Sequence, residues 1–551
     1  MLVALGVTKV YGVVGGQTLA ITDAILDTPE IEFIHTRHEG AAAVMADAYG
    51  RLTGRPAVCI ATTGPGATNL LTGVGGAFRD SSPAIVITCN NNGENIHKDD
   101  AQNADHVELF KPLTKLSRLV AHQTSITQAM EEAYTVAMTG NPGPVHLDFA
   151  RDTIEGIMQD APDVPVPHPC LSWVGDRPSA GEASLRAAVE LIRAAERPVL
   201  WLGNGVNRSG AATDLLALAE LLNVPIVTTF NGIGCVPNDH PLVFGAASRM
   251  GTNLSTRVLE QADLVIAVGN SLNAVSTTRW RRALPRVLQV DVDPSMIGRY
   301  YSDVTTGVVS DAASFARALV ALLASEAGRV AAAREGWIAE LSAARADWWA
   351  ASDAELTAGS DAPVSPATLV RALREVSPDD VVLIPDAGNP GVWSFLWEVR
   401  AAGAYIKPVG FGNMGFALPS AIASVTIDPQ RPVLALIGDG SLGMSLGELE
   451  TLARVGGPVA IVVLNDSSYG NIRQEQVLHF AGRTIGVDFT DVDFAGVARA
   501  MGVDGVRTTD GARILDAVAT AFSRGTPVVI DVPIDREVNA WTYPPFVPYQ
   551  P

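Results

Sequence analysis

Short apolar runs rich in β-branched residues alternate with longer Ala- and Leu-rich segments along almost the whole of this 551-residue chain. Runs of about four to eight such residues predict buried strands, and the segments between them predict helices. Strands joined by helical crossovers lie parallel in one sheet, with helices on both of its faces. The clearest strand signals fall at residues 58–66, 83–89, 144–150, 197–205, 224–230, 262–270, 286–293, 380–388, 432–440, 458–466 and 527–533. The chain therefore predicts an α/β fold of doubly wound parallel sheets.

Two stretches interrupt this alternation. Residues 161–169 are rich in proline, and residues 351–366 are rich in Ala, Ser and Asp, which is typical of linkers. The length is too great for one ordinary hydrophobic core, so a division into several domains is expected. We predict three domains, at residues 1–160, 175–345 and 363–551.

The charge balance narrows the possible partners. The chain has 39 Lys and Arg against 59 Asp and Glu, a net charge of −20, which disfavours binding to nucleic acid or to an anionic membrane surface. No apolar run reaches the roughly 18 residues of a membrane span, and the first residues make a poor secretory signal. The four cysteines are widely spaced and form no CxxC pair. We expect a cytoplasmic protein that binds neither nucleic acid nor membrane.

One strand–helix–strand unit carries acidic residues at both of its turns. Gly438-Asp439-Gly440 ends the strand signal at 432–440, and Asn465-Asp466 ends the next one, at 458–466. Parallel neighbours joined by one crossover bring these turns to the same sheet edge, where two carboxylates can share a hard cation such as Mg²⁺. The two glycines let the backbone approach an anion such as a diphosphate. Alone, a Gly-Asp-Gly triplet is more often a simple turn.

Further motifs accompany this unit. They are HTRHEGAAAVMADAYGRLTG (35–54), TTGPGATNLLTGVGGAFRDSSP (62–83), FNGIGCVPNDHPL (230–242), VLQVDVDP (287–294) and FGNMGFALPSAIA (411–423). Together they resemble the thiamine-diphosphate-dependent enzymes of the acetolactate synthase-like, or pyruvate oxidase, group over nearly the whole chain. The resemblance implies a pyrimidine-binding, a central and a diphosphate-binding domain, in that order. It also implies thiamine diphosphate and Mg²⁺ as cofactors.

The resemblance assigns site residues as well. Asp439 and Asp466 would be side-chain metal ligands, with the carbonyl of Ser468 as a third. Glu39 matches the glutamate that hydrogen-bonds a ring nitrogen of the cofactor, and Gln102 matches a glutamine near the substrate. The other implied cofactor contacts are Asn389, Gly412, Met414, Gly438, Gly440 and Ser441, of which Met414 would hold the two cofactor rings in a bent arrangement.

Three positions depart from the group's pattern. Most relatives have Asn in place of Asp466, so an extra negative charge would either tighten the metal or weaken the anion. Residues 269–280, GNSLNAVSTTRW, replace the stretch typical of flavin-binding relatives, so FAD is not expected. Glu475 stands where the anabolic acetolactate synthases carry a substrate-selecting Trp.

We therefore expect a decarboxylase or carboligase that acts on a 2-oxo acid. The alternative is a carbon–carbon lyase acting on a 2-hydroxyacyl-CoA or a related adduct, which Glu475 and the missing flavin pattern favour. A catalytically silent relative would lack Glu39. A nicotinamide dehydrogenase, whose fingerprint is a GxGxxG motif with an acidic residue about 20 positions further on, is not expected. In this group two subunits share each active site, so a homodimer or homotetramer is expected.

Overall fold

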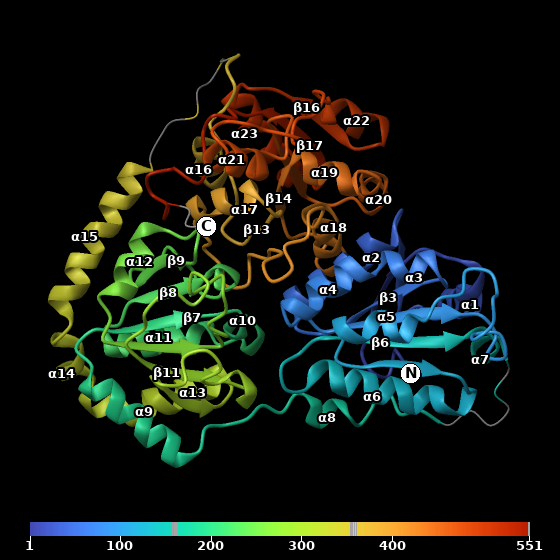
Figure 1. Ribbon diagram of the computed structural model, residues 1–551, viewed down its shortest axis with the longest axis horizontal. Coiled ribbons are helices and arrows are strands. Elements are labelled where there is room, and N and C mark those ends of the chain that lie inside the picture. Colours follow the sequence, from blue (N-terminus) through green and yellow to red (C-terminus); the bar gives the residue numbers. More distant parts are fainter. Residues whose placement is uncertain (157, 159–162, 353–355, 357–358, 360, 549–551) are drawn as a thin grey trace.

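The computed structural model describes residues 1–548 except 157, 159–162, 353–355, 357–358 and 360. Three α/β domains lie side by side, each around one parallel sheet, as Figure 1 shows in blue, green and orange to red. The predicted fold class of three doubly wound parallel-sheet domains is confirmed. Both predicted linkers fall partly on residues outside the described ones.

The first domain contains a sheet in the order β2-β1-β3-β4-β6-β5. Its strands are β1 (Lys9–Gly12), β2 (Glu32–His35), β3 (Ala57–Ala61), β4 (Ala84–Asn90), β5 (Ser117–Val120) and β6 (Pro144–Ala150). Its helices are α1 (Leu19–Leu26), α2 (Glu39–Thr53), α3 (Pro65–Asn69), α4 (Leu71–Arg79), α5 (His106–Phe110), α6 (Ile126–Met138), α7 (Arg151–Glu155) and α8 (Leu171–Val174). The central strands β3, β4 and β6 are buried at every residue, as expected of a sheet covered on both faces.

The middle domain contains a sheet in the order β12-β11-β10-β7-β8-β9. Its strands are β7 (Pro198–Leu202), β8 (Ile226–Thr229), β9 (Val243–Ala247), β10 (Leu264–Val268), β11 (Arg286–Asp291) and β12 (Thr305–Val309). Its helices are α9 (Glu182–Ala194), α10 (Gly205–Ser209), α11 (Ala212–Leu222), α12 (Asn253–Glu260), α13 (Ala312–Leu323) and α14 (Ala327–Ala332). The long helix α15 (Glu335–Ala351) then runs along this domain toward the third one (Figure 1).

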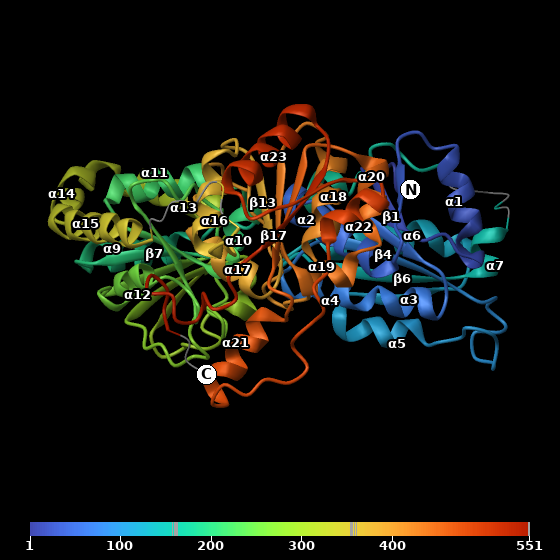
Figure 2. The same cartoon turned by 90° about the horizontal axis from the view of Figure 1, so that it is seen from above.

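The third domain contains a sheet in the order β13-β14-β15-β17-β16. Its strands are β13 (Val382–Pro385), β14 (Val433–Gly438), β15 (Val459–Asn465), β16 (Asp504–Arg507) and β17 (Val528–Pro533). Its helices are α16 (Pro366–Glu375), α17 (Asn389–Trp393), α18 (Ala417–Ile427), α19 (Asp439–Ser445), α20 (Glu448–Val455), α21 (Gly470–His479), α22 (Phe494–Ala500) and α23 (Gly511–Arg524). Seen from above, α21 extends away from this sheet (Figure 2).

The first and third domains share one hydrophobic core. Apolar side chains of α2 pack against those of α18, and the cluster continues into both sheets. The buried hydroxyls of Tyr11 and Thr426 are hydrogen-bonded across this interface at 2.8 Å. The two domains of one chain are thus held as a packed pair.

A buried carboxylate joins all three domains. Asp80, at the end of α4, accepts hydrogen bonds from the Arg51 guanidinium, the Asn231 side chain and the backbone N–H groups of Val409 and Gly410. Its own carbonyl oxygen accepts from Arg208 of the middle domain. The Asp80 side chain is only 1% exposed, so these bonds form in a region shielded from water.

The segment after β14 differs from the expectation. The sequence predicts one helix after the Gly-Asp-Gly turn, whereas the structure has α19 followed by α20, with Gly447 as the N-cap residue of the second. The helix α19 begins at Asp439 itself. Among the described residues, no helix is both long and apolar enough to cross a membrane.

Candidate functional site

The two predicted acidic turns meet at the carboxyl edge of the third sheet. Strands β14 and β15 pair in parallel, with Gly438 opposite Leu464, so the turns that follow them are neighbours. Asp439 Oδ2 and Asp466 Oδ1 each accept a hydrogen bond from the same N–H, that of Ser468, at 3.1 Å. The structure therefore brings together the three residues that the sequence predicts as metal ligands.

The two carboxylates repel each other in a poorly hydrated site. Burial, and after it the charge of Asp466, raises the pKa of Asp439 to about 7. Burial also raises the pKa of Asp466. A bound cation would remove this repulsion. Hard oxygen donors of this kind fit Mg²⁺.

The protein supplies only part of a coordination shell there. Within the described ranges, no three side chains of His, Cys, Asp or Glu cluster tightly enough to hold a metal. Two carboxylates leave several of the six oxygen positions of Mg²⁺ to backbone carbonyls, water or phosphate oxygens. Such a site suits a metal that is bound together with a phosphorylated ligand.

The backbone around the carboxylates is open on one side and tight on the other. A Cβ on Gly438 would approach only the Pro390 ring, at 3.8 Å, whereas one on Gly440 would meet the Tyr469 ring at 2.8 Å. Asn389 begins α17 and accepts a hydrogen bond from the Asn471 side chain at 3.0 Å. The predicted diphosphate contacts therefore lie around the acidic pair, with Ser441 buried in the first turn of α19.

The loop that carries Gly412 and Met414 is held at both ends. Asp80 accepts from the Gly410 N–H at 2.8 Å, and Asp386 accepts from the Ala417 N–H, the first residue of α18, at 2.8 Å. Burial raises the pKa of Asp386 to about 6. Gly412 has φ +72° and open space where a Cβ would be, and Met414 is partly exposed. The loop is thus firmly anchored while its middle remains accessible.

Glu39 lies at the edge of the first sheet and not at the edge of the third sheet, where the acidic pair lies. It is the first residue of α2, partly exposed, and its Oε2 accepts from the Asn69 side chain at 2.9 Å. The turn before it is fixed by the buried Glu448 of α20, whose Oε1 accepts from the N–H groups of Arg37 and His38, both at 3.0 Å. Burial raises the pKa of Glu448. The third domain therefore positions the turn that presents Glu39.

Gln102 is exposed and lies, like Glu39, beside the loop that follows β3. Its carbonyl oxygen accepts from the Thr63 hydroxyl at 3.2 Å, and Gly64 packs directly against it. Gly66, two residues further on, would place a Cβ 3.5 Å from Glu39 Oε1. The loop after β3 therefore links the two residues that the sequence predicts as catalytic.

Within one chain, Glu39 and the Met414 loop are apart. A Cβ on Gly76 would lie 3.2 Å from Asn413 Oδ1 and 3.4 Å from Asp47 Oδ2, so the loop reaches α2 near Asp47. Asp47 is eight residues beyond Glu39 on that helix, a rise of about 12 Å. The predicted residues thus fall into two groups, one at the third sheet and one at the first.

Three buried carboxylates with a role in this arrangement were not identified from the sequence. Asp386 follows β13 as Asp439 follows β14, and that repeated strand-Asp pattern could have indicated it. Asp80 and Glu448 act across domain boundaries, and no local pattern predicts such contacts.

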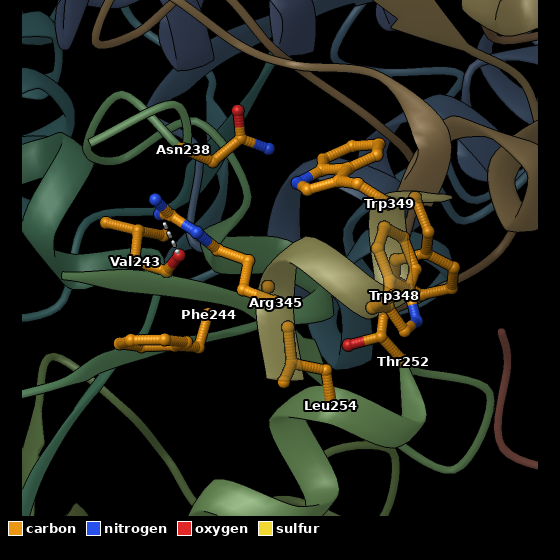
Figure 3. A pocket seen from close by; sticks show the side chains of 10 residues that line it. Asn238, Val243, Phe244, Thr252, Leu254, Arg345, Trp348 and Trp349 are labelled. Carbon is orange, nitrogen blue, oxygen red and sulfur yellow. Dashed lines mark hydrogen bonds between the residues drawn. The ribbon is translucent and has the colours of Figure 1, made fainter. Parts of the chain in front are cut away.

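A cavity elsewhere in the molecule is too small for a cofactor. It lies where β9 and α12 of the middle domain face α15, and Figure 3 shows Arg345, Trp348 and Trp349 around it. Its volume is about 30 Å³, which is room for one or two water molecules. Arg345 Nη1 donates to the Val243 carbonyl there, at 3.3 Å, so this group serves packing between the elements.

Comparison with known proteins matches all three domains. The chain matches the family descriptions "Thiamine pyrophosphate enzyme, N-terminal TPP binding domain" over residues 1–109, "central domain" over 185–319 and "C-terminal TPP binding domain" over 386–532. It is 32% identical to a probable acetolactate synthase large subunit of Methanocaldococcus jannaschii, covering 97% of this chain and 90% of that protein. It is also 32% identical to an acetolactate synthase of Mycobacterium bovis (98% and 87% covered) and 31% identical to an acetolactate synthase large subunit of Corynebacterium glutamicum (97% and 85% covered).

Proposed function

The chain belongs to the thiamine pyrophosphate enzymes, in the group that contains the acetolactate synthases, and from that premise we propose that it is a decarboxylase and carboligase acting on a 2-oxo acid. The observation that carries the proposal is the acidic pair Asp439 and Asp466 at the edge of the third sheet. We also propose the domain limits 1–160, 175–345 and 363–551.

The third domain would hold the metal and the diphosphate. Asp439, Asp466 and the Ser468 carbonyl would bind Mg²⁺, and the open backbone at Gly438 and the N-terminus of α19 would face the diphosphate. Asn389 and Ser441 are the proposed side-chain contacts on either side. FAD is not part of the proposal, because residues 269–280 depart from the flavin-binding pattern.

The remaining residues would orient the cofactor and move a proton. When bound, thiamine diphosphate supplies the electron sink for the pair left when a 2-oxo acid loses carbon dioxide. The Gly412 carbonyl would accept a hydrogen bond from the cofactor's amine, and Met414 would support the bent arrangement of its rings. Glu39 would hold a proton at a ring nitrogen, as a general acid and base. Gln102 would contact the substrate from the first domain.

We propose that two copies of the chain share each site. Glu39 lies about 12 Å along α2 from the point where the Met414 loop contacts this helix, which is too far for both to touch one cofactor ring in the same chain. The partner subunit's Glu39 would complete the site instead. Within a homodimer, or within a homotetramer built from two such dimers, every site would then contain residues of two protomers.

Subunit complementation tests the shared site. Glu39→Gln and Asp439→Asn should each be inactive alone, while co-expressed mixtures should regain activity because one site per heterodimer contains both native residues. Mixtures that stay inactive, although heterodimers form, would show that each chain builds its own site.

Turnover of a substrate panel tests the reaction. The purified protein is given 2-oxo acids and 2-hydroxyacyl-CoA thioesters with Mg²⁺ and thiamine diphosphate, and carbon dioxide and carboligation products are measured. Release of carbon dioxide from a 2-oxo acid supports the proposal. Cleavage of the thioesters alone would favour the lyase. The specific observation behind this alternative is the position of Glu475 on α21.

A further inference from the structure

A fully buried polar network crosses the carboxyl half of the first sheet. Asp148 of β6 accepts from the Thr88 hydroxyl at 2.6 Å and from the Asn90 side chain at 2.8 Å. Its Oδ1 also lies 2.9 Å from Nδ1 of His106, the first residue of α5. These four residues are at most 1% exposed, so each bond forms without competition from water.

The network fixes the tautomer of His106. Its Nε2 lies 3.0 Å from the backbone nitrogen of Gly64, which can only donate a hydrogen bond. Nε2 must therefore be the unprotonated acceptor, and the ring hydrogen sits on Nδ1 and is donated to Asp148. Reversing the tautomer would place two donors against each other at Gly64. Asp148 thus orients the imidazole toward the loop after β3.

That loop is the one that connects the two predicted catalytic residues. Gly64 has φ +62° and packs against the Gln102 carbonyl, while Gln102 itself has φ +60°. His106 follows Gln102 by four residues, so it fixes both the loop after β3 and the end of the segment that carries Gln102. No other side chain among the described residues is seen to hydrogen-bond the Gly64 N–H.

We propose that His106, oriented by Asp148, is a positioning residue that sets the place of Gln102 and of the Gly64–Gly66 turn beside Glu39. This rests on the proposed function, in which Gln102 contacts the 2-oxo acid. His106 touches neither substrate nor cofactor in this account and acts through the backbone that it holds.

A second histidine provides a matched control. His146 of β6 is equally buried, belongs to the same network through Thr88, and is also hydrogen-bonded to Ser117 and stacked on Phe110. It lies two residues before Asp148 on the same strand face, one step further from the site. Substitution there disturbs the core to a similar degree without removing a bond to the loop.

The test compares the variants His106→Asn, His106→Gln, His146→Asn and His146→Gln. Asn at 106 keeps a donor toward Asp148 but loses the acceptor for the Gly64 N–H, whereas Gln reaches far enough to keep that acceptor. We expect His106→Asn to raise KM for the 2-oxo acid and to lower kcat/KM by about 10- to 100-fold. His106→Gln should stay within about threefold of wild type, and both His146 variants should leave KM unchanged.

Hydrogen exchange gives a readout that does not depend on turnover. Peptides covering residues 62–69 and 99–105 should lose amide protection in His106→Asn, should regain it in His106→Gln, and should remain as in wild type in the His146 variants. The exchange measurement can be made even if the protein turns over no 2-oxo acid. A failure of the proposed function would therefore be distinguished from a failure of the positioning role of His106. If His106→Asn does not fold, His106→Leu, which also has no acceptor for the Gly64 N–H, takes its place, with His146→Leu as its control.

Two results would overturn the proposal. The first is a folded His106→Asn variant with wild-type protection of residues 62–69 and unchanged KM. The second is a His146 variant that disturbs these peptides and KM as much as the corresponding His106 variant, because the effect would then come from the core in general.

Discussion

Replacing Gly470 by Ala probes the acidic pair without substituting either of its two aspartates. Gly470 is the first residue of α21, and a Cβ built on it would lie 2.4 Å from Asp466 Oδ2. Real Cβ atoms do not come closer than 3.0 Å to such a neighbour, so Asp466 must move by at least about 0.6 Å. Metal–ligand distances tolerate only about 0.2 Å, so the displaced oxygen would no longer fit the site.

We expect Gly470→Ala to raise the dissociation constant for Mg²⁺ by about 10- to 100-fold, the size of effect seen when the surroundings of a metal ligand are altered. The measurement is a calorimetric titration of Mg²⁺ into protein with thiamine diphosphate in excess. The helix itself should not suffer, because Ala has a higher helix propensity than Gly.

Gly443→Ala is the matched control. Gly443 lies in α19, and a Cβ on it would have no atom within 4 Å. This variant should bind Mg²⁺ like the wild type and gain up to about 1 kcal/mol in stability. If Gly470→Ala binds Mg²⁺ as tightly as Gly443→Ala, Asp466 is not a metal ligand and the reasoning fails.

Three further predictions concern charge and burial. Asp80→Ala leaves the Arg51 guanidinium and two N–H groups short of an acceptor, so urea unfolding should show a loss of about 3–5 kcal/mol, and a loss under 1 kcal/mol would contradict it. Burial lowers the pKa of His146 to about 3, below the value near 6.5 in the unfolded chain. The buried neutral imidazole therefore contributes to stability above pH 6.5. This contribution is lost toward pH 3, at up to about 1.4 kcal/mol per pH unit. Between pH 7 and pH 5.5 this group should lower the free energy of unfolding by about 1.3 kcal/mol, and His146→Asn should reduce that fall; an unchanged fall would contradict the prediction. Asp466→Asn keeps a ligand oxygen but removes a charge, so Mg²⁺ should bind about tenfold more weakly in the same titration, and tighter binding would refute this.

Most of the strands that the sequence analysis did not identify lie at sheet edges; β1, which pairs with both β2 and β3, is the exception. The central strands, such as β14 and β15, are continuous apolar runs because both of their faces are covered. The edge strands β2 (EFIH) and β16 (DGVR) are only partly buried, so their residues lack that pattern. β12, also at an edge, begins with two threonines and a glycine. The position of a strand, central or at an edge of the sheet, therefore determines how apolar its residues need to be.

The site shows the same division between local and long-range information. Asp439 and Asp466 could be placed together because one crossover joins their strands, and chain connectivity alone fixes that geometry. The contacts of Glu448 with the turn before Glu39 join residues about 410 positions apart. Nothing in the local sequence of either segment indicates such a pairing, since it depends on how two domains pack.

The most direct measurement for the central claim is the rate of carbon dioxide release from the best 2-oxo acid by the wild type and by Glu39→Gln, both saturated with Mg²⁺ and thiamine diphosphate. A general acid and base contributes about 10²- to 10⁴-fold, so kcat should fall by that factor while the dissociation constant of the cofactor stays within a few-fold. A Glu39→Gln variant that releases carbon dioxide at the wild-type rate would contradict the account.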